Sequence, residues 1–205
     1  RDQVREVIES QRLIEAQEDD ASKDDASKDA GGRQAGSTVA TETILDHAGG
    51  SVQRALMLAD PEVFEFRQTL CERLATGDPH AGDFAKTLIA FSDTGGKEAY
   101  RKRRQMKLAG DFAIDFYRAC CMRLSGVETS TPTTDAVEKF VGRYAKTPEA
   151  GASFAGDCID RTSEFQYHVS ANAGLPNSVD SWLIDLGRLC RGELVTTGAT
   201  LSGIV

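Results

Sequence analysis

The stretch VDSWLIDLGRLC, residues 179–190, decides the fold class of this chain. Its apolar side chains recur at positions i, i+3, i+4, i+7, i+10 and i+11, which are Val179, Trp182, Leu183, Leu186, Leu189 and Cys190. An α-helix completes a turn in 3.6 residues, so this spacing places all of them on one face. We expect Ser178 to cap the start of the helix and Gly192 to end it. The stretch therefore predicts an amphipathic helix that packs against a core.

Comparable periodicity recurs upstream and predicts a succession of helices. In one of them Asp60 provides a cap and Pro61 suits the first helical position, and its apolar stripe is formed by Val63, Phe66, Leu70 and Leu74. No segment shows the strict alternation, bounded by hairpin turns, that is typical of a strand. The predicted fold class is all-α. The other expected helices cover residues 2–14, 41–47, a short segment capped by Ser51, and residues 81–91, 97–124, 135–145 and 148–171.

Residues 15–37 have a different character. The pentapeptide DASKD occurs twice in succession, at 20–24 and 25–29, and Gly31 and Gly32 follow it. A stretch so rich in charge and so poor in large apolar groups cannot bury enough surface to offset the entropy lost on ordering. We expect a flexible, solvent-exposed acidic insertion here, and a frayed tail at residues 193–205.

Composition limits the functions that the chain can have. Its 205 residues are 40% hydrophobic and 27% charged, a balance typical of globular proteins. With a net charge of −8 and a pI near 5.0, the molecule as a whole is not attracted to nucleic acid or anionic membranes. No apolar run approaches the roughly 20 residues of a membrane span, and no signal-peptide core follows the N-terminus. Because the chain opens without Met, we expect a processed chain or a piece of a longer protein.

The residue types that catalysis uses are not grouped along the sequence. The glycine pairs lack the Lys-Ser/Thr of a phosphate-binding loop, and no serine has a Gly-x-Ser-x-Gly context. The histidines, His47, His80 and His168, are far apart and have no metal-ligand spacing. Five cysteines without a CxxC pair favour buried, unpaired thiols in a reducing cytoplasm: Cys71, Cys120, Cys121, Cys158 and Cys190. We expect no active site, no metal and no cofactor.

One basic cluster stands out in this acidic chain. It consists of Arg101, Lys102, Arg103, Arg104 and Lys107. It could contact DNA phosphates or an acidic partner surface. Alternatively, it is the solvated start of a long helix, because four adjacent charges surround a helix instead of forming one stripe.

Residues 44–75 read ILDHAGGSVQRALMLADPEVFEFRQTLCERLA. This run resembles the junction between the lid and collar domains of bacterial clamp-loader subunits of DNA polymerase III, most closely the delta-prime type. In that family a "GS-x-x-x-AL-x-L" helix ends the lid and the next helix opens the collar. Residues 158–189 are similar to its last two collar helices, with Asn172 and Asn177 in the turn between them. ATP-hydrolysing relatives have a sensor-2 arginine where this chain has Gln53, with Arg54 one residue later and rotated on the helix.

The resemblance implies an architecture and a role. It implies lid-domain helices at 1–59, with the insertion at 15–37, a helical collar at 60–192 and a tail at 193–205. It implies a non-catalytic, cytoplasmic scaffold in a pentameric hetero-oligomer that loads the sliding clamp on primed DNA. Two alternatives stay open: a fragment of the ATPase motor (gamma/tau-like) subunit, or an unrelated helical binding module. Candidate residues for the collar core or a subunit interface are Phe112, Phe116, Phe165, Trp182, Leu186 and Leu189.

Overall fold

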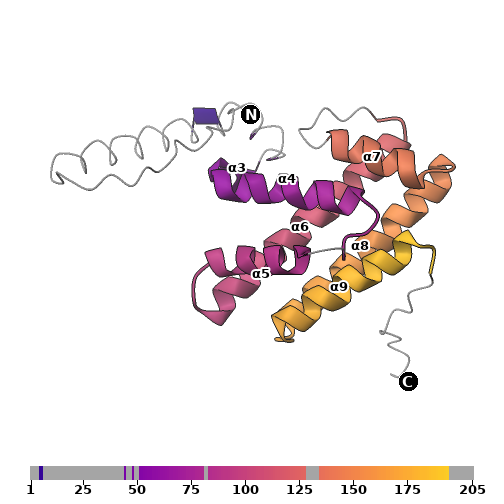
Figure 1. Ribbon diagram of the computed structural model, residues 1–205. Helices are drawn as coiled ribbons and strands as arrows, with labels where there is room; N and C mark the ends of the chain where they lie inside the picture. Colours follow the sequence, from indigo (N-terminus) through magenta and orange to yellow (C-terminus); the bar gives the residue numbers. More distant parts are fainter. Residues whose placement is uncertain are drawn as a thin grey trace, which may run out of the picture. The chain divides into compact units, whose positions relative to one another are not determined.

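A computed structural model describes residues Arg5, Glu6, Ile44 and Ala48, and the ranges 51–80, 83–127 and 134–193. Within these residues there are seven complete helices and no strand, so the predicted all-α class is confirmed for this part of the chain (Figure 1). The helices are α3 (Val52–Ala59), α4 (Pro61–Ala75), α5 (Phe84–Thr94), α6 (Ala99–Leu124), α7 (Thr134–Tyr144), α8 (Pro148–Ser170) and α9 (Leu175–Cys190).

The chain forms two compact units, Arg1–Phe66 and Arg67–Val205. The sequence-based boundary at residue 60 differs from this division, which falls within α4. The predicted insertion at 15–37 lies outside the described residues, as do most of the helices expected at 2–14 and 41–47 and nearly all of the expected tail. Of those two helices, Arg5, Glu6 and Ile44 are described and are helical.

In the first unit, local hydrogen bonds set where the helices begin. The Ser51 hydroxyl accepts a hydrogen bond from the backbone N–H of Arg54 at 3.3 Å, so the predicted cap of α3 is confirmed. The Asp60 carboxylate accepts one from the N–H of Glu62 at 2.9 Å, and Pro61 is the first residue of α4, as expected. These two caps let α4 follow α3 with a single intervening residue.

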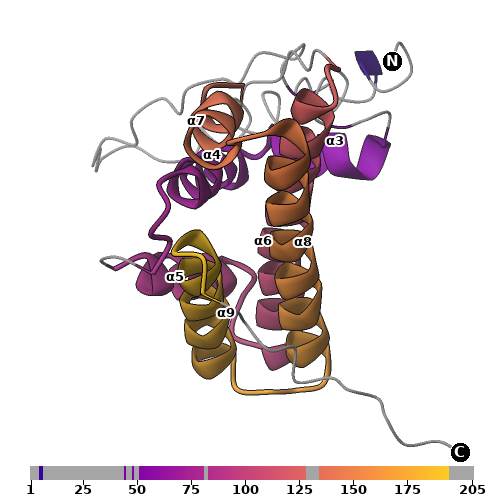
Figure 2. The ribbon, with the colours of Figure 1, turned by 90° about the vertical axis from the view of Figure 1, so that its right-hand side faces the viewer.

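The second unit is organised around α6 and α8, which lie side by side (Figure 2). Near one end the Gln166 side chain donates to the carbonyl oxygen of Lys107 at 3.0 Å. Toward the other end the Cys121 thiol lies 3.9 Å from the carbonyl oxygen of Ala152. Rising residue numbers on α6 therefore face falling numbers on α8, which makes the two helices antiparallel.

The remaining helices close the core on this pair. Helix α9 packs against α8 through stacked rings of Phe165 and Trp182, whose centroids are 4.5 Å apart. The Trp182 indole N–H also donates to the Thr162 hydroxyl at 3.2 Å, which satisfies a polar group that α9 buries. Helix α5 contacts both α6 and α9.

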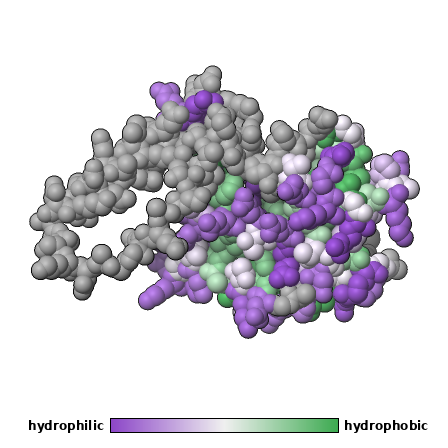
Figure 3. Space-filling view, turned by 45° about the horizontal axis from the view of Figure 1, so that its top comes forward, coloured by the Kyte–Doolittle hydropathy of each residue, from purple (hydrophilic) through white to green (hydrophobic). Residues whose placement is uncertain are grey.

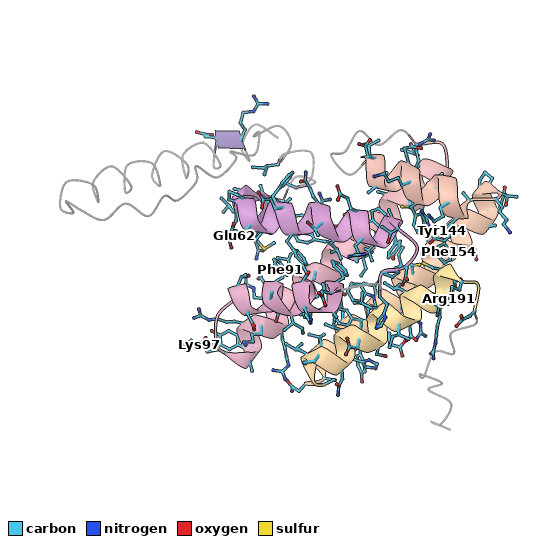
Figure 4. The ribbon with its side chains drawn as sticks, viewed as in Figure 1. Glu62, Phe91, Lys97, Tyr144, Phe154 and Arg191 are labelled. Carbon is cyan, nitrogen blue, oxygen red and sulfur yellow. The ribbon has the colours of Figure 1, made fainter. Side chains whose placement is uncertain are left out.

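Aromatic side chains fill the space between α6, α7 and α8. Phe140 of α7 meets Phe116 and Tyr117 of α6 edge-on, at centroid distances of 5.8 and 5.6 Å. Its other side stacks on Phe154 of α8 at 5.5 Å, and Tyr144 lies 4.7 Å from Phe154 (Figure 4). Such pairs add to the free energy gained by burying the rings, so this cluster anchors α7 to the antiparallel pair.

Two details of the expected last helix are wrong. Helix α9 begins at Leu175, with Gly174 as its N-cap and Pro176 in the first turn, so Ser178 is a buried helical residue and not a cap. A proline early in the first turn removes no helical hydrogen bond, which lets the helix start earlier. For the same reason Asn177 lies within α9, whereas Asn172 is in the turn with a φ of 64°. Gly192 follows the helix with a φ of 74°, as its predicted role requires.

Candidate interaction surfaces and buried polar groups

The six apolar residues proposed for the core or an interface divide unequally between interior and surface. Five are buried within the chain: Phe112, Phe116, Phe165, Trp182 and Leu186. Leu189, near the end of α9, is half-buried. The five buried side chains stabilise this domain by removing apolar surface from water, and they are not accessible to a neighbouring subunit. Of the six residues, Leu189 is the one that can contribute both to the core of the domain and to a subunit interface.

Large apolar side chains do reach the surface at separate points. Within the described residues the most exposed are Tyr167, at 70%, and Tyr100, at 65%, followed by Met122, Val127, Val52 and Ile184. Single exposed apolar side chains are normal on soluble proteins. On the face shown in Figure 3, small apolar patches alternate with hydrophilic residues. A docking surface on this face would therefore mix apolar and polar groups.

The basic cluster is partly neutralised by neighbouring carboxylates. Arg101 pairs with Glu98 at 2.6 Å, and Lys102 pairs with Asp93 at 2.6 Å. Arg103 is half-buried, and its Nε atom has no hydrogen-bond partner. The cations point in different directions around α6, as expected for adjacent helical residues. Arg104 and Lys107 are exposed, and neither forms an ion pair with a described residue.

The sensor-2-like position lies near the start of α3. Gln53 is exposed, and Arg54 is half-buried. The backbone N–H of Arg54 is used by the Ser51 cap and so is not offered to a bound anion. The assignment of Gln53 and Arg54 to a sensor-2-like position stays a prediction, because the described residues include no nucleotide-binding core against which it could be checked.

A charged cluster that the sequence did not reveal joins α8 to α9. Arg161 is 7% exposed, and its Nη1 atom lies 2.7 Å from Glu164 Oε2 and 3.6 Å from Asp185 Oδ2. The 2.7 Å contact has ion-pair distance without hydrogen-bond geometry, since Glu164 Oε2 has no hydrogen-bond partner. The second terminal nitrogen of Arg161, Nη2, has no hydrogen-bond partner either. Asp185 also lies 3.6 Å from Arg188. The buried arginine therefore has its charge compensated by one carboxylate of its own helix and one of α9.

Burial suppresses the reactivity of the thiols. It raises the pKa of Cys71 to about 11, and raises those of Cys120 and Cys158 above their usual range. Tyr117 beside Cys158 and Tyr144 beside Cys190 act to lower the pKa of these thiols, but burial is the larger effect. A buried thiol that stays protonated is a poor nucleophile. The interpretation of Cys71, Cys120 and Cys158 as buried small hydrophobes is therefore confirmed.

The described part of the chain contains no group of His, Cys, Asp and Glu side chains that could hold a metal ion. Among its helices, none combines the length and the apolar content needed to cross a bilayer. Comparison with protein families, characterised proteins and solved structures found no match to this chain.

Proposed function

We propose that this chain is a non-catalytic scaffold part of a bacterial replicative clamp loader, of the delta-prime type. The observation that supports the proposal best is the junction of α3 and α4. A short helix capped by Ser51 is followed at once by a helix capped by Asp60 and opened by Pro61. This is the local arrangement that the resemblance requires where a lid passes into a collar.

The order of the last helices gives further support. The resemblance calls for a long amphipathic helix, a turn containing asparagine and a final leucine-rich helix. The chain has α8, the left-handed turn residue Asn172, and then α9 with Leu183 and Leu186 buried. In this proposal the helical unit after Phe66 docks side by side with those of sister subunits in a pentameric collar. The assembly then opens the sliding clamp and places it on primed DNA, in the cytoplasm.

The chain's role in this proposal is shape and contact, with no chemical step. Gln53 stands where ATP-hydrolysing relatives have their sensor-2 arginine, and a neutral amide cannot compensate a phosphate charge as a guanidinium does. The buried thiols supply no activated nucleophile. Both observations favour a subunit that holds its neighbours in position over one that reads or cleaves ATP.

The test is assembly with the clamp-loader subunits of the same organism. The full chain is mixed with the purified motor and delta subunits, and the mixture is separated by gel filtration. Co-elution is expected, and its absence in every combination would exclude the scaffold role in favour of an unrelated binding module.

Three surface variants then locate the docking face. Met122→Glu, Tyr167→Glu and Ile184→Glu each place a charge at an exposed apolar position on α6, α8 and α9. Each is expected to keep its far-UV circular dichroism spectrum, because none fills a buried site. At least one should abolish co-elution. Unchanged co-elution of all three would place the docking face elsewhere than on these helices.

The gene sequence upstream of Arg1 distinguishes the motor-subunit alternative from the delta-prime type. An intact Gly-Lys-Ser/Thr phosphate loop following a predicted strand there would favour the motor subunit. A degenerate loop would favour the delta-prime type.

A further inference from the structure

The charge on residues 97–107 opposes that of the whole chain. This segment, KEAYRKRRQMK, contains six cations and one acid in a protein of net charge −8. Two of the cations are neutralised locally, Arg101 by Glu98 and Lys102 by Asp93. Among the others, three are exposed and form no ion pair with a described residue: Lys97, Arg104 and Lys107.

Two exposed tyrosines lie on α6, the helix of Arg104 and Lys107, and on its neighbour α8. Tyr100 precedes Arg104 by four residues and Lys107 by seven, so all three share one face of α6. The Arg101 guanidinium donates to the Tyr100 hydroxyl at 2.9 Å, which restrains the ring at the surface.

On α8, Tyr167 follows Gln166, whose amide donates to Lys107 O and to Asp111 Oδ1. Tyr167 is therefore level with Lys107 on the helix that runs beside α6 (Figure 2). Lys97 lies at the turn that leads into α6 (Figure 4). We call Lys97, Tyr100, Arg104, Lys107 and Tyr167 the Tyr100 face.

We propose that the Tyr100 face binds single-stranded nucleic acid. Lysine and arginine neutralise backbone phosphates, and exposed aromatic rings stack on unpaired bases whatever their sequence. A duplex keeps its bases stacked inside, so it would use the cations and leave the two tyrosines without a role. An acidic polypeptide without apolar or aromatic side chains would likewise engage only the cations. The rings at 65% and 70% exposure therefore favour an unpaired strand.

The number of free cations sets the expected salt dependence. Each phosphate contact on a single strand contributes a slope of about 0.7 to the fall of log affinity with log salt. Three contacts give a slope of about 2, so a tenfold rise in salt should weaken binding about 100-fold. Because the rest of the chain is acidic, binding should be measurable at low salt and weak at physiological salt. The inference does not rest on the clamp-loader proposal, since the Tyr100 face belongs to this chain alone.

The experiment measures fluorescence anisotropy of labelled oligothymidylate with the full chain, from about 20 to about 200 mM salt. The double variant Arg104→Gln/Lys107→Gln should reduce the slope to about 0.7, because one cation remains. The matched control is Lys139→Gln/Lys146→Gln, which removes the same charge from two exposed lysines in or next to α7. The control should keep a slope near 2.

The tyrosines are tested separately. Tyr100→Ala and Tyr167→Ala should each weaken binding about fivefold or more without changing the slope, because they remove stacking and no charge. Tyr100→Phe and Tyr167→Phe keep a ring and should retain the affinity of the natural chain.

Three results would overturn the inference: equal slopes for the charge variant and its control, equal affinity for duplex DNA of the same length, or equal affinity for polyglutamate. Circular dichroism verifies the fold of each variant. Gel-filtration assembly with partner subunits is a separate readout, so either proposal can fail while the other stands.

Discussion

Helix α8 contains two glycines, five residues apart, at which the same substitution should have opposite effects. Gly151 is buried where α8 begins. A Cβ atom there would lie 2.8 Å from the Cβ and 3.1 Å from the Cα of Ala145, and 3.0 Å from a methyl group of Leu124. At Gly156 a Cβ atom would meet nothing within 4 Å. We predict that Gly156→Ala stabilises the protein and that Gly151→Ala destabilises it.

The magnitudes follow from two competing effects. Alanine favours a helix over glycine by about 1 kcal/mol, and both substitutions gain this amount at most. Extra atoms forced into a packed site cost about 1–3 kcal/mol. The Leu124 methyl group can rotate away, but the backbone of Ala145, in the connection between α7 and α8, has to shift. The two variants should therefore differ by about 1–3 kcal/mol in the free energy of unfolding.

Thermal unfolding followed by circular dichroism measures the difference. For a chain of this size about 1 kcal/mol shifts Tm by roughly 2–4 °C. Gly156→Ala should raise Tm by about this amount, and Gly151→Ala should lower it. Gly142→Ala in α7 is a second control, because a Cβ atom there also meets nothing within 4 Å. If Gly151→Ala proved as stable as Gly156→Ala, the close packing of the α7–α8 connection against α8 would be refuted.

Three further predictions concern the core and its titration. Phe140→Ala should cost about 3–5 kcal/mol in chemical denaturation, since it empties the centre of the aromatic cluster, whereas Tyr167→Ala at an exposed site should change stability by less than about 0.5 kcal/mol. Thr162→Val should cost about 1–3 kcal/mol because it leaves the Trp182 indole N–H without its acceptor, and adding Trp182→Phe should cost less than the sum of the two single changes. The free energy of unfolding should fall as pH rises from about 9 toward 11. Over this range Cys71 stays protonated in the folded chain, because its pKa is raised to about 11, whereas the thiol of the unfolded chain, with a pKa of 9.0, loses its proton. Midpoints of urea unfolding that do not change across this range would contradict the burial of Cys71.

The sequence predicted helices well where it also contained their boundary signals. The Ser51 and Asp60 caps, the Pro61 start and the Gly192 stop all proved correct, because each rests on hydrogen bonds or backbone angles within one turn. The start of α9 was misplaced because two local signals competed. Ser178 has a capping side chain, but the helix begins before Pro176, whose ring suits the first turn.

Tertiary relations were much less predictable. An apolar stripe shows which face of a helix is covered, but not whether its own domain or a neighbour covers it, so Phe112 and Trp182 could not be assigned from spacing. The Arg161 cluster was missed for a similar reason. Glu164 lies one turn away on α8, but Asp185 comes from α9, and only the packing of the two helices brings it within 3.6 Å.

The burial of the apolar stripes limits how this chain could act as a scaffold. Exposed apolar side chains of the described part, such as Met122, Tyr167 and Ile184, lie on different helices. A scaffold that docks through such dispersed apolar side chains would form contacts typical of interfaces that form and separate and not of obligate ones. Each pairwise contact should then be modest. A stable ring would arise because closing it lets each subunit bind two neighbours at once, which raises the effective concentration of the last contact. The chain should therefore co-elute weakly with any single partner subunit and firmly with the complete set. Tight binding to one isolated partner would contradict this expectation.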